Sequence, residues 1–202
     1  MPERSYRQNC GIARAADLLG ERWALLIVRD LLIAPRRFSE LERRLKGMGT
    51  NLLARRLKDM AAAGLVVNGG LRDPYALSDM GRALEPMVLQ MVRWSLQWVP
   101  IPANPDGLHF PDWDLLALKA LFVPNADLAV PVLAQFEHGG WQAWVRIAPS
   151  SCAYGLGKPD TPSDVSFPCL VSALRSPAGI LRQLPPGQIA SAKKFLAAFP
   201  LN

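Results

Sequence analysis

The chain has 202 residues, of which half are apolar, and a formal net charge of +6. This length and apolar fraction can fill one large domain or two small ones. The sequence has no apolar leader or membrane-spanning run, and Cys10, Cys152 and Cys169 are spaced for neither a disulfide framework nor a zinc site. We therefore expect a soluble, cytoplasmic protein that has no membrane partner and binds no metal.

Charge and proline are distributed unevenly along the chain. Residues 1–100 contain 16 Lys and Arg against 10 Asp and Glu, whereas residues 101–202 contain 7 of each. Thirteen of the 18 prolines lie in the second half, and residues 99–107 contain three prolines. A helix cannot continue through such a stretch, so it is interpreted as a linker. We predict two domains, residues 1–99 and residues 107–202.

The first predicted elements are two helices, from about Gly11 to Leu19 and from Glu21 to Ile33. Their apolar residues recur at helical spacing, and Pro35 ends the second helix. Trp23 is large and apolar, and we expect it to anchor the core of the first domain.

A helix-turn-helix pattern follows. Residues 36–45 predict a short helix, in which Ser39 and Glu42 have the spacing of a capping box, and residues 46–49 supply a tight, glycine-containing turn. Residues 49–67 begin with an amphipathic helix whose apolar face consists of Leu53, Leu57 and Met60. Arg56 neighbours the packed Leu57, and we expect it to pair with an acidic residue.

The opposite face of this helix is polar and cationic, as in a helix that reads base edges in a DNA major groove. The alternative is a solvated surface helix. The surrounding pattern favours DNA, because a helix precedes it and residues 65–67 and 75–77 predict a β-hairpin wing with Arg72 near its tip. We assign phosphate contacts to the preceding basic residues and the wing, base readout to the start of the helix, and a flanking backbone contact to one lysine; in chain order the residues are Arg36, Arg37, Arg43, Arg44, Lys46, Thr50, Asn51, Arg55, Lys58 and Arg72.

These segments resemble the successive motifs of the HxlR-type winged helix-turn-helix regulators. The resemblance covers about residues 8–98 and rests on CGIAR from Cys10, LGERW from Leu19, RFSEL from Arg37, NLLARRL from Asn51, AGL from Ala63 and LSDMG from Leu77. It implies a dimeric bacterial transcriptional regulator whose second motif helix enters the major groove. Gly49 departs from the family pattern, which has a hydroxyl residue there, so we expect the N-cap to move to Thr50.

A long helix is predicted from Asp79 to about Trp98, with Ser78 as its N-cap. Its apolar side is wider than a small winged helix can cover, which fits a dimer interface. In the family that the chain resembles, this helix and the N-terminal helix commonly form that interface. The residues assigned to it are Leu84, Met87, Val88, Met91, Trp94 and Trp98.

The second half predicts an α+β domain with a small antiparallel sheet. A helix over residues 112–122 precedes four strand-like runs, residues 128–136, 141–147, 152–156 and 163–168, and two helices close the chain, residues 169–174 with an extension past Pro177 and residues 188–199. The last stretch weakly resembles sterol-carrier-protein-like domains, which implies a pocket for an apolar effector. The alternative is that Phe136, Trp141, Trp144, Phe167, Phe195 and Phe199 form a packed core.

The function predicted from the sequence is a homodimeric DNA-binding transcriptional regulator that acts on a pseudo-palindromic operator. The alternative is an apolar-ligand-binding or carrier protein whose C-terminal pocket is the main activity. No nucleophile elbow, phosphate loop or histidine–carboxylate pattern indicates an enzyme, and no cofactor is expected. Cys10 is a candidate redox sensor, because it lies at the expected start of a helix near Arg7 and Arg14; the alternative is a small buried hydrophobe.

Overall fold

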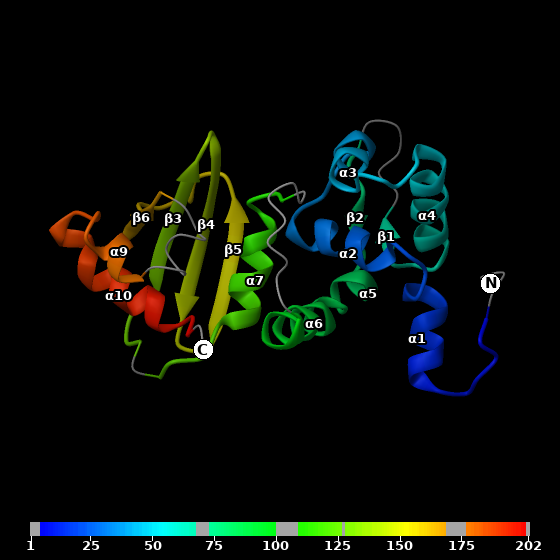
Figure 1. Ribbon diagram of the computed structural model, residues 1–202, viewed down its shortest axis with the longest axis horizontal. Helices are drawn as coiled ribbons and strands as arrows, with labels where there is room; N and C mark the ends of the chain where they lie inside the picture. The colour runs from blue at the N-terminus through cyan, green and yellow to red at the C-terminus, as the bar shows by residue number, and fades with distance from the viewer. Residues whose placement is uncertain (1–4, 68–72, 100–108, 127, 169–176, 201–202) are drawn as a thin grey trace. The chain divides into compact units, whose positions relative to one another are not determined.

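The computed structural model describes residues 5–67, 73–99, 109–126, 128–168 and 177–200. The chain divides into two compact units, Met1–Val88 and Leu89–Asn202 (Figure 1). The boundary between the units falls inside helix α6 (Glu85–Trp98). Most of the predicted linker, residues 100–107, lies outside the described residues.

The first unit begins with helices α1 (Gly11–Leu19) and α2 (Ala24–Ile33). The bounds predicted for α1 are confirmed, whereas α2 begins three residues later than predicted. The cause is Trp23, whose φ of 83° places it in the left-handed region and so outside a right-handed helix. At the other end of α2, Ala34 is extended, which is the conformation favoured before a proline.

The predicted helix-turn-helix is formed by α3 (Phe38–Arg44) and α4 (Thr50–Ala62). Both predicted caps are wrong by a short shift. The N-cap of α3 is Arg37, whose backbone N–H donates to Glu40 Oε2 at 2.8 Å, and the N-cap of α4 is Gly49, so Thr50 is already helical. Gly47 has a φ of 94°, which only glycine adopts at low cost, and it turns the chain between the two helices.

The wing is a short hairpin. Strand β1 (Val66–Val67) pairs antiparallel with β2 (Ala76–Leu77), and a backbone bridge between Arg36 and Tyr75 joins the segment before α3 to the wing. The wing-tip residue Arg72 lies outside the described residues.

The predicted long helix is interrupted. It forms α5 (Asp79–Arg82) and, after a short break, α6. Ser78 caps α5 as predicted, because its Oγ accepts from the Gly81 N–H at 3.1 Å. Pro86 has no N–H to donate to the Arg82 carbonyl, so a continuous helix would lose a hydrogen bond at this point.

One apolar core holds the first unit together. It joins the buried faces of α2, α3 and α4 to the wing and to the start of α6; its central residues are Ile27, Leu31, Leu41, Leu45, Leu53, Leu57, Leu65, Leu77 and Val88. Full burial of one such side chain is worth about 1.5–3 kcal/mol, so this core fixes the orientation of α4 within the unit.

The second unit contains a four-stranded sheet and its helices. Helix α7 (Trp113–Leu121) precedes strands β3 (Val132–His138), β4 (Trp141–Ala148), β5 (Ser151–Leu156) and β6 (Val165–Phe167); α9 (Pro177–Leu181), the 3-10 helix η1 (Pro186–Gln188) and α10 (Ile189–Ala197) follow. The strand order is β5-β4-β3-β6. Neighbouring strands are antiparallel except β3 and β6, which are parallel. The predicted antiparallel pairing holds for β3, β4 and β5 and is wrong for β6, because the chain crosses from the β5 edge to the β6 edge.

The two faces of this sheet differ. Phe136 and Phe167 are buried on one face and pack with Phe195 of α10, with ring centroids 5.4–5.9 Å apart. Trp144 alternates with the buried Ala143 and Val145 and so lies on the opposite face. There its ring covers Gly155, where a Cβ atom would come within 2.6 Å of the indole. The predicted helix at residues 169–174 lies outside the described residues.

Candidate nucleic-acid interface

Helix α4 presents a polar and cationic face. Leu53, Leu57 and Met60 are buried in the core, as predicted. The side chains assigned to DNA on this helix are all exposed; they are Thr50, Asn51, Arg55 and Lys58. Helical geometry forces this separation, because residues three and four apart share a face. The exposed face begins at the N-terminus of α4, where the helix dipole adds positive potential.

Three cations assigned to phosphates precede this face in the sequence. Arg37 caps α3, Arg43 lies in its last turn and Lys46 lies in the turn before α4, and all three are exposed. The turn is held by a contact between α3 and α4, because the Thr50 hydroxyl donates to Glu42 Oε1 at 2.5 Å. Glu42, which the sequence placed in a capping box with Ser39, instead accepts this bond from Thr50.

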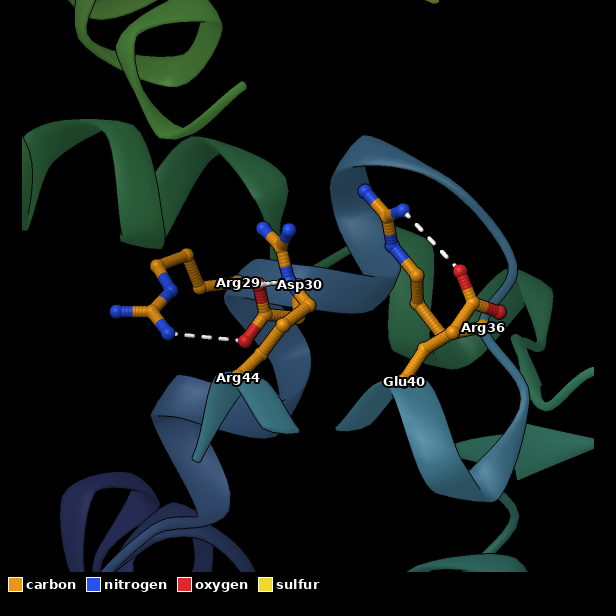
Figure 2. A network of polar contacts seen from close by, with 5 residues as sticks. All are labelled: Arg29, Asp30, Arg36, Glu40 and Arg44. Atoms are coloured by element: carbon orange, nitrogen blue, oxygen red, sulfur yellow. Dashed lines mark hydrogen bonds and ion pairs between the residues drawn. The ribbon is translucent and has the colours of Figure 1, made fainter. Parts of the chain in front are cut away.

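Arg44 is not part of this surface, and its assignment to phosphate contact is wrong. Its side chain is only 4% exposed, and its Nε donates to Asp30 Oδ1 at 2.7 Å (Figure 2). The other carboxylate oxygen of Asp30 accepts from Arg29 Nη2 at 2.9 Å. Asp30 is completely buried in α2, so the charge of Arg44 joins α3 to α2 within the protein.

Arg36 is also buried, so its predicted phosphate contact is wrong as well. Its backbone N–H and carbonyl both bond to Tyr75 beside the wing, at 2.9 and 2.8 Å. Its Nη1 lies 3.8 Å from Glu40 Oε1 in α3 (Figure 2). Arg36 therefore fixes the wing against the helix-turn-helix.

Arg56 has the acidic partners that the sequence predicted for it. Its Nη2 donates to Glu21 Oε2 at 2.5 Å, and its Nη1 lies 3.5 Å from Asp59 Oδ2. Glu21 precedes α2 and is far from Arg56 in sequence, so spacing alone gave no signal for this pair.

The residues assigned to dimerisation separate into two groups. Val88 is buried in the core of its own unit and so is not available to a partner, whereas Leu84 is partly buried and packs against the same core. Met87, Met91, Trp94 and Trp98 are exposed and recur at helical spacing along one side of α6.

Cys10 is the N-cap of α1 and is exposed. The backbone N–H groups of Ala13 and then Ile12 stabilise its thiolate and hold the pKa of Cys10 below its usual range. Its placement differs from that of Cys152, which is buried in β5.

Two further features were sought among the described residues, a metal-binding cluster and a membrane-spanning helix. They contain no group of three His, Cys, Asp or Glu side chains that could hold a metal ion. None of their helices is both long and apolar enough to cross a membrane. His109 pairs with Asp114 Oδ1 at 3.0 Å at the start of α7.

The fold and the exposed face of α4 define a winged helix-turn-helix protein. A family model described as HxlR-like helix-turn-helix matches residues 18–102. The chain is 35% identical over 91 residues to YvaP of Bacillus subtilis, an uncharacterised HTH-type transcriptional regulator; the match covers 43% of this chain and 84% of YvaP. The chain belongs to the HxlR-like family, and it is a DNA-binding transcriptional regulator.

Two further comparisons give the extent of the similarity. The chain is 33% identical over 99 residues to the HTH-type regulator Rv3095 of Mycobacterium tuberculosis, covering 46% of this chain and 62% of that relative. The crystal structure of quinone-bound YodB from B. subtilis matches with 31% identity and a TM-score of 0.40, covering 43% of this chain and 97% of YodB.

Proposed function

We propose that the protein binds a pseudo-palindromic operator as a homodimer, with α4 of each subunit in a major groove. The observation that carries this proposal is the exposed set of Thr50, Asn51, Arg55 and Lys58 opposite the buried face of α4. Base readout falls to the first three of these residues. Lys58 and the exposed Arg37, Arg43 and Lys46 neutralise phosphates. Two-fold symmetry places half-site centres about 34–36 Å apart, or a multiple of this distance.

The first experiment selects DNA from a random pool with the pure protein and measures affinity for the selected site and a scrambled site across a salt titration. Arg55→Ala should lower the preference for the selected site by roughly 1–3 kcal/mol. Arg43→Ala should weaken binding to both DNAs and reduce the salt slope by about one. Lys193→Ala, which removes one exposed positive charge from α10, is the control. If Arg55→Ala and Arg43→Ala both bind as wild type does, α4 is not the recognition helix.

A redox response is a second candidate, and the exposed, acidified thiol of Cys10 favours it. The thiolate is the reactive form of cysteine, and the N-terminus of a helix favours it. YodB, which is 32% identical to this chain over 89 residues, has been solved with a bound quinone and after diamide treatment. We propose that oxidation of Cys10 changes DNA affinity. Diamide should therefore alter operator binding by the wild-type protein and leave binding by Cys10→Ser unchanged.

The alternative of an apolar-ligand carrier with a sterol-carrier-like domain has less support. The Phe195 ring lies 5.0–5.9 Å from the rings of Phe136, Phe167 and Phe199. Such contacts favour the interpretation of these rings as a packed core. We assign the second unit an accessory role in the regulator.

A further inference from the structure

The short turn between α1 and α2 contacts the helix-turn-helix at two places. Arg56 of α4 reaches Glu21 of this turn across 35 positions in sequence, with 2.5 Å between Arg56 Nη2 and Glu21 Oε2. The Trp23 ring lies 3.8 Å from the position that a Cβ atom on Gly47 would occupy, so it packs against the turn between α3 and α4. Two points of contact restrain both the position and the rotation of α4.

The turn itself is tightly constrained. Trp23 has the left-handed φ of 83°, which is an outlier for a bulky side chain and persists only where the surrounding structure holds it. The Gly20 N–H donates to the Ala16 carbonyl at 2.7 Å, and a Cβ atom at Gly20 would lie 2.6 Å from that oxygen. The backbone conformation of the turn that carries Glu21 is therefore closely restricted.

Arg55 and Arg56 are consecutive on α4 but occupy different environments. The side chain of Arg55 is 64% exposed, whereas that of Arg56 is 16% exposed. Both guanidinium groups lie near the same oxygen, Asp59 Oδ2, at 3.9 Å from Arg55 Nε and 3.5 Å from Arg56 Nη1. These two distances exceed a hydrogen bond, so Asp59 can move towards either cation. Glu21 binds the other terminal nitrogen of Arg56, Nη2, and so limits how closely the Arg56 guanidinium can approach Asp59.

The geometry points to Glu21 as a positioning residue for sequence readout, an inference that rests on the proposed role of Arg55 at the operator. Glu21 holds Arg56 against the turn, Arg56 shares Asp59 with Arg55, and Asp59 biases where the guanidinium of Arg55 lies. Loss of the Glu21 contact lets Arg56 move towards Asp59 and releases Arg55 from it. The released Arg55 contacts phosphates of any sequence more readily, and discrimination between DNA sites falls.

A positioning role of the Glu21–Arg56 pair can be distinguished from a contribution to stability. The side chain of Glu21 is 42% exposed, and partly exposed ion pairs contribute little to the free energy of unfolding. Substitution of Glu21 should therefore change DNA discrimination much more than the melting temperature.

The test uses full-length protein and DNA selected by the wild type, and it measures the ratio of affinities for the selected and scrambled sites. Glu21→Asp preserves the charge but shortens the side chain by one methylene, whereas Glu21→Gln preserves the length and removes the charge. Both should lower the ratio roughly tenfold, the scale of one base contact, with the melting temperature nearly unchanged. Glu137→Asp, at an exposed position of β3, is the matched control and should leave the ratio unchanged.

A double-mutant cycle identifies the partner. Once Arg56→Gln has removed the guanidinium, Glu21→Gln should have no further effect on the ratio, so the two changes should be non-additive. Wild-type discrimination in Glu21→Asp, or additive effects in the cycle, would overturn the inference while leaving the proposed function intact. If the wild type selects no DNA, the proposed function fails first, and the role of Glu21 fails with it.

Discussion

The carboxylate of Asp30 lies between two guanidinium groups, and it connects the scaffold helix α2 to the first helix of the DNA-binding motif. Arg44 and Arg29 each bond to one of its oxygens, at 2.7 and 2.9 Å. A completely buried carboxylate is costly without such partners, because burial removes its hydration. The Asp30–Arg44 ion pair therefore favours the arrangement of α2 and α3 in which these two side chains meet.

Asp30→Asn should destabilise the first unit by about 3–5 kcal/mol, because Arg44 would stay buried without its counter-charge. Denaturant unfolding measures this change. Asp59→Asn alters an exposed pair and should cost about 1 kcal/mol or less. The double variant Asp30→Leu with Arg44→Met should recover much of the stability, since it removes both charges from the core. A loss below 1 kcal/mol for Asp30→Asn would show that the buried pair does not hold α3.

The pKa of Cys10, held low by the N–H groups of Ala13 and Ile12, gives a dependence on pH. An acid with a lowered pKa is more ionised at neutral pH, and the thiolate is the species that iodoacetamide alkylates. In the folded protein, alkylation of Cys10 should therefore accelerate and level off at lower pH than in urea, where the ordinary value of about 8.5 applies. Peptide mass spectrometry separates Cys10 from the other cysteines. Coincident profiles in the two states would remove the basis for a redox role.

At the residue scale, the sequence predicted the exposed face of α4 but could not distinguish neighbouring arginines. Arg43 and Arg44 are adjacent and chemically identical, yet only Arg43 is exposed. The difference arises from Asp30, which lies 14 positions away and becomes a partner only after folding. The lone acid in the apolar run ALLIVRDLLI of α2 was the available signal, because an acid buried in such a run needs a cation.

At the scale of elements, helical and strand periodicity predicted most of the architecture and turn chemistry predicted its breaks. The predictions failed where contacts distant in sequence decide the outcome. Nothing in the alternation of β6 specifies that it pairs parallel to β3, because a strand has the same pattern in both directions. The break before α6 was predictable from Pro86, since a proline lacks the N–H that a helix interior requires.

Helix α6 has an exposed apolar stripe of Met87, Met91, Trp94 and Trp98. Trp94, within this stripe, is 60% exposed. Changing Met91 and Trp94 together to Ser should convert the proposed dimer to monomers and weaken operator binding, because the two half-sites would no longer be engaged as one unit. Sedimentation measures the change. Gln90→Ser with Gln97→Ser, exposed polar positions on the same helix, is the control. A dimer that survives the first pair of changes would place the interface elsewhere.

At the scale of the whole molecule, charge and packing separate the two units. The entire net charge of +6 belongs to the first 100 residues, which include the α4 face, whereas the second half is neutral overall. Each unit also has its own apolar interior, which includes Leu57 in the first and Phe195 in the second. The sequence predicted two domains from the charge and proline distribution, and the structure divides the chain at Val88, inside α6.

Separate cores predict separate thermal transitions. Leu57→Ala creates a cavity beneath α4 and should destabilise the first unit by about 2–5 kcal/mol, whereas Phe195→Ala removes the ring that contacts Phe136, Phe167 and Phe199 and should destabilise the second unit by about 3–5 kcal/mol. Calorimetry with and without selected DNA assigns the transitions, because bound DNA raises only the transition of the unit that binds it. DNA should therefore raise the transition that Leu57→Ala lowers and leave the transition that Phe195→Ala lowers unchanged. A single transition, lowered equally by either substitution and raised as a whole by DNA, would instead mean that the two units unfold as one cooperative body.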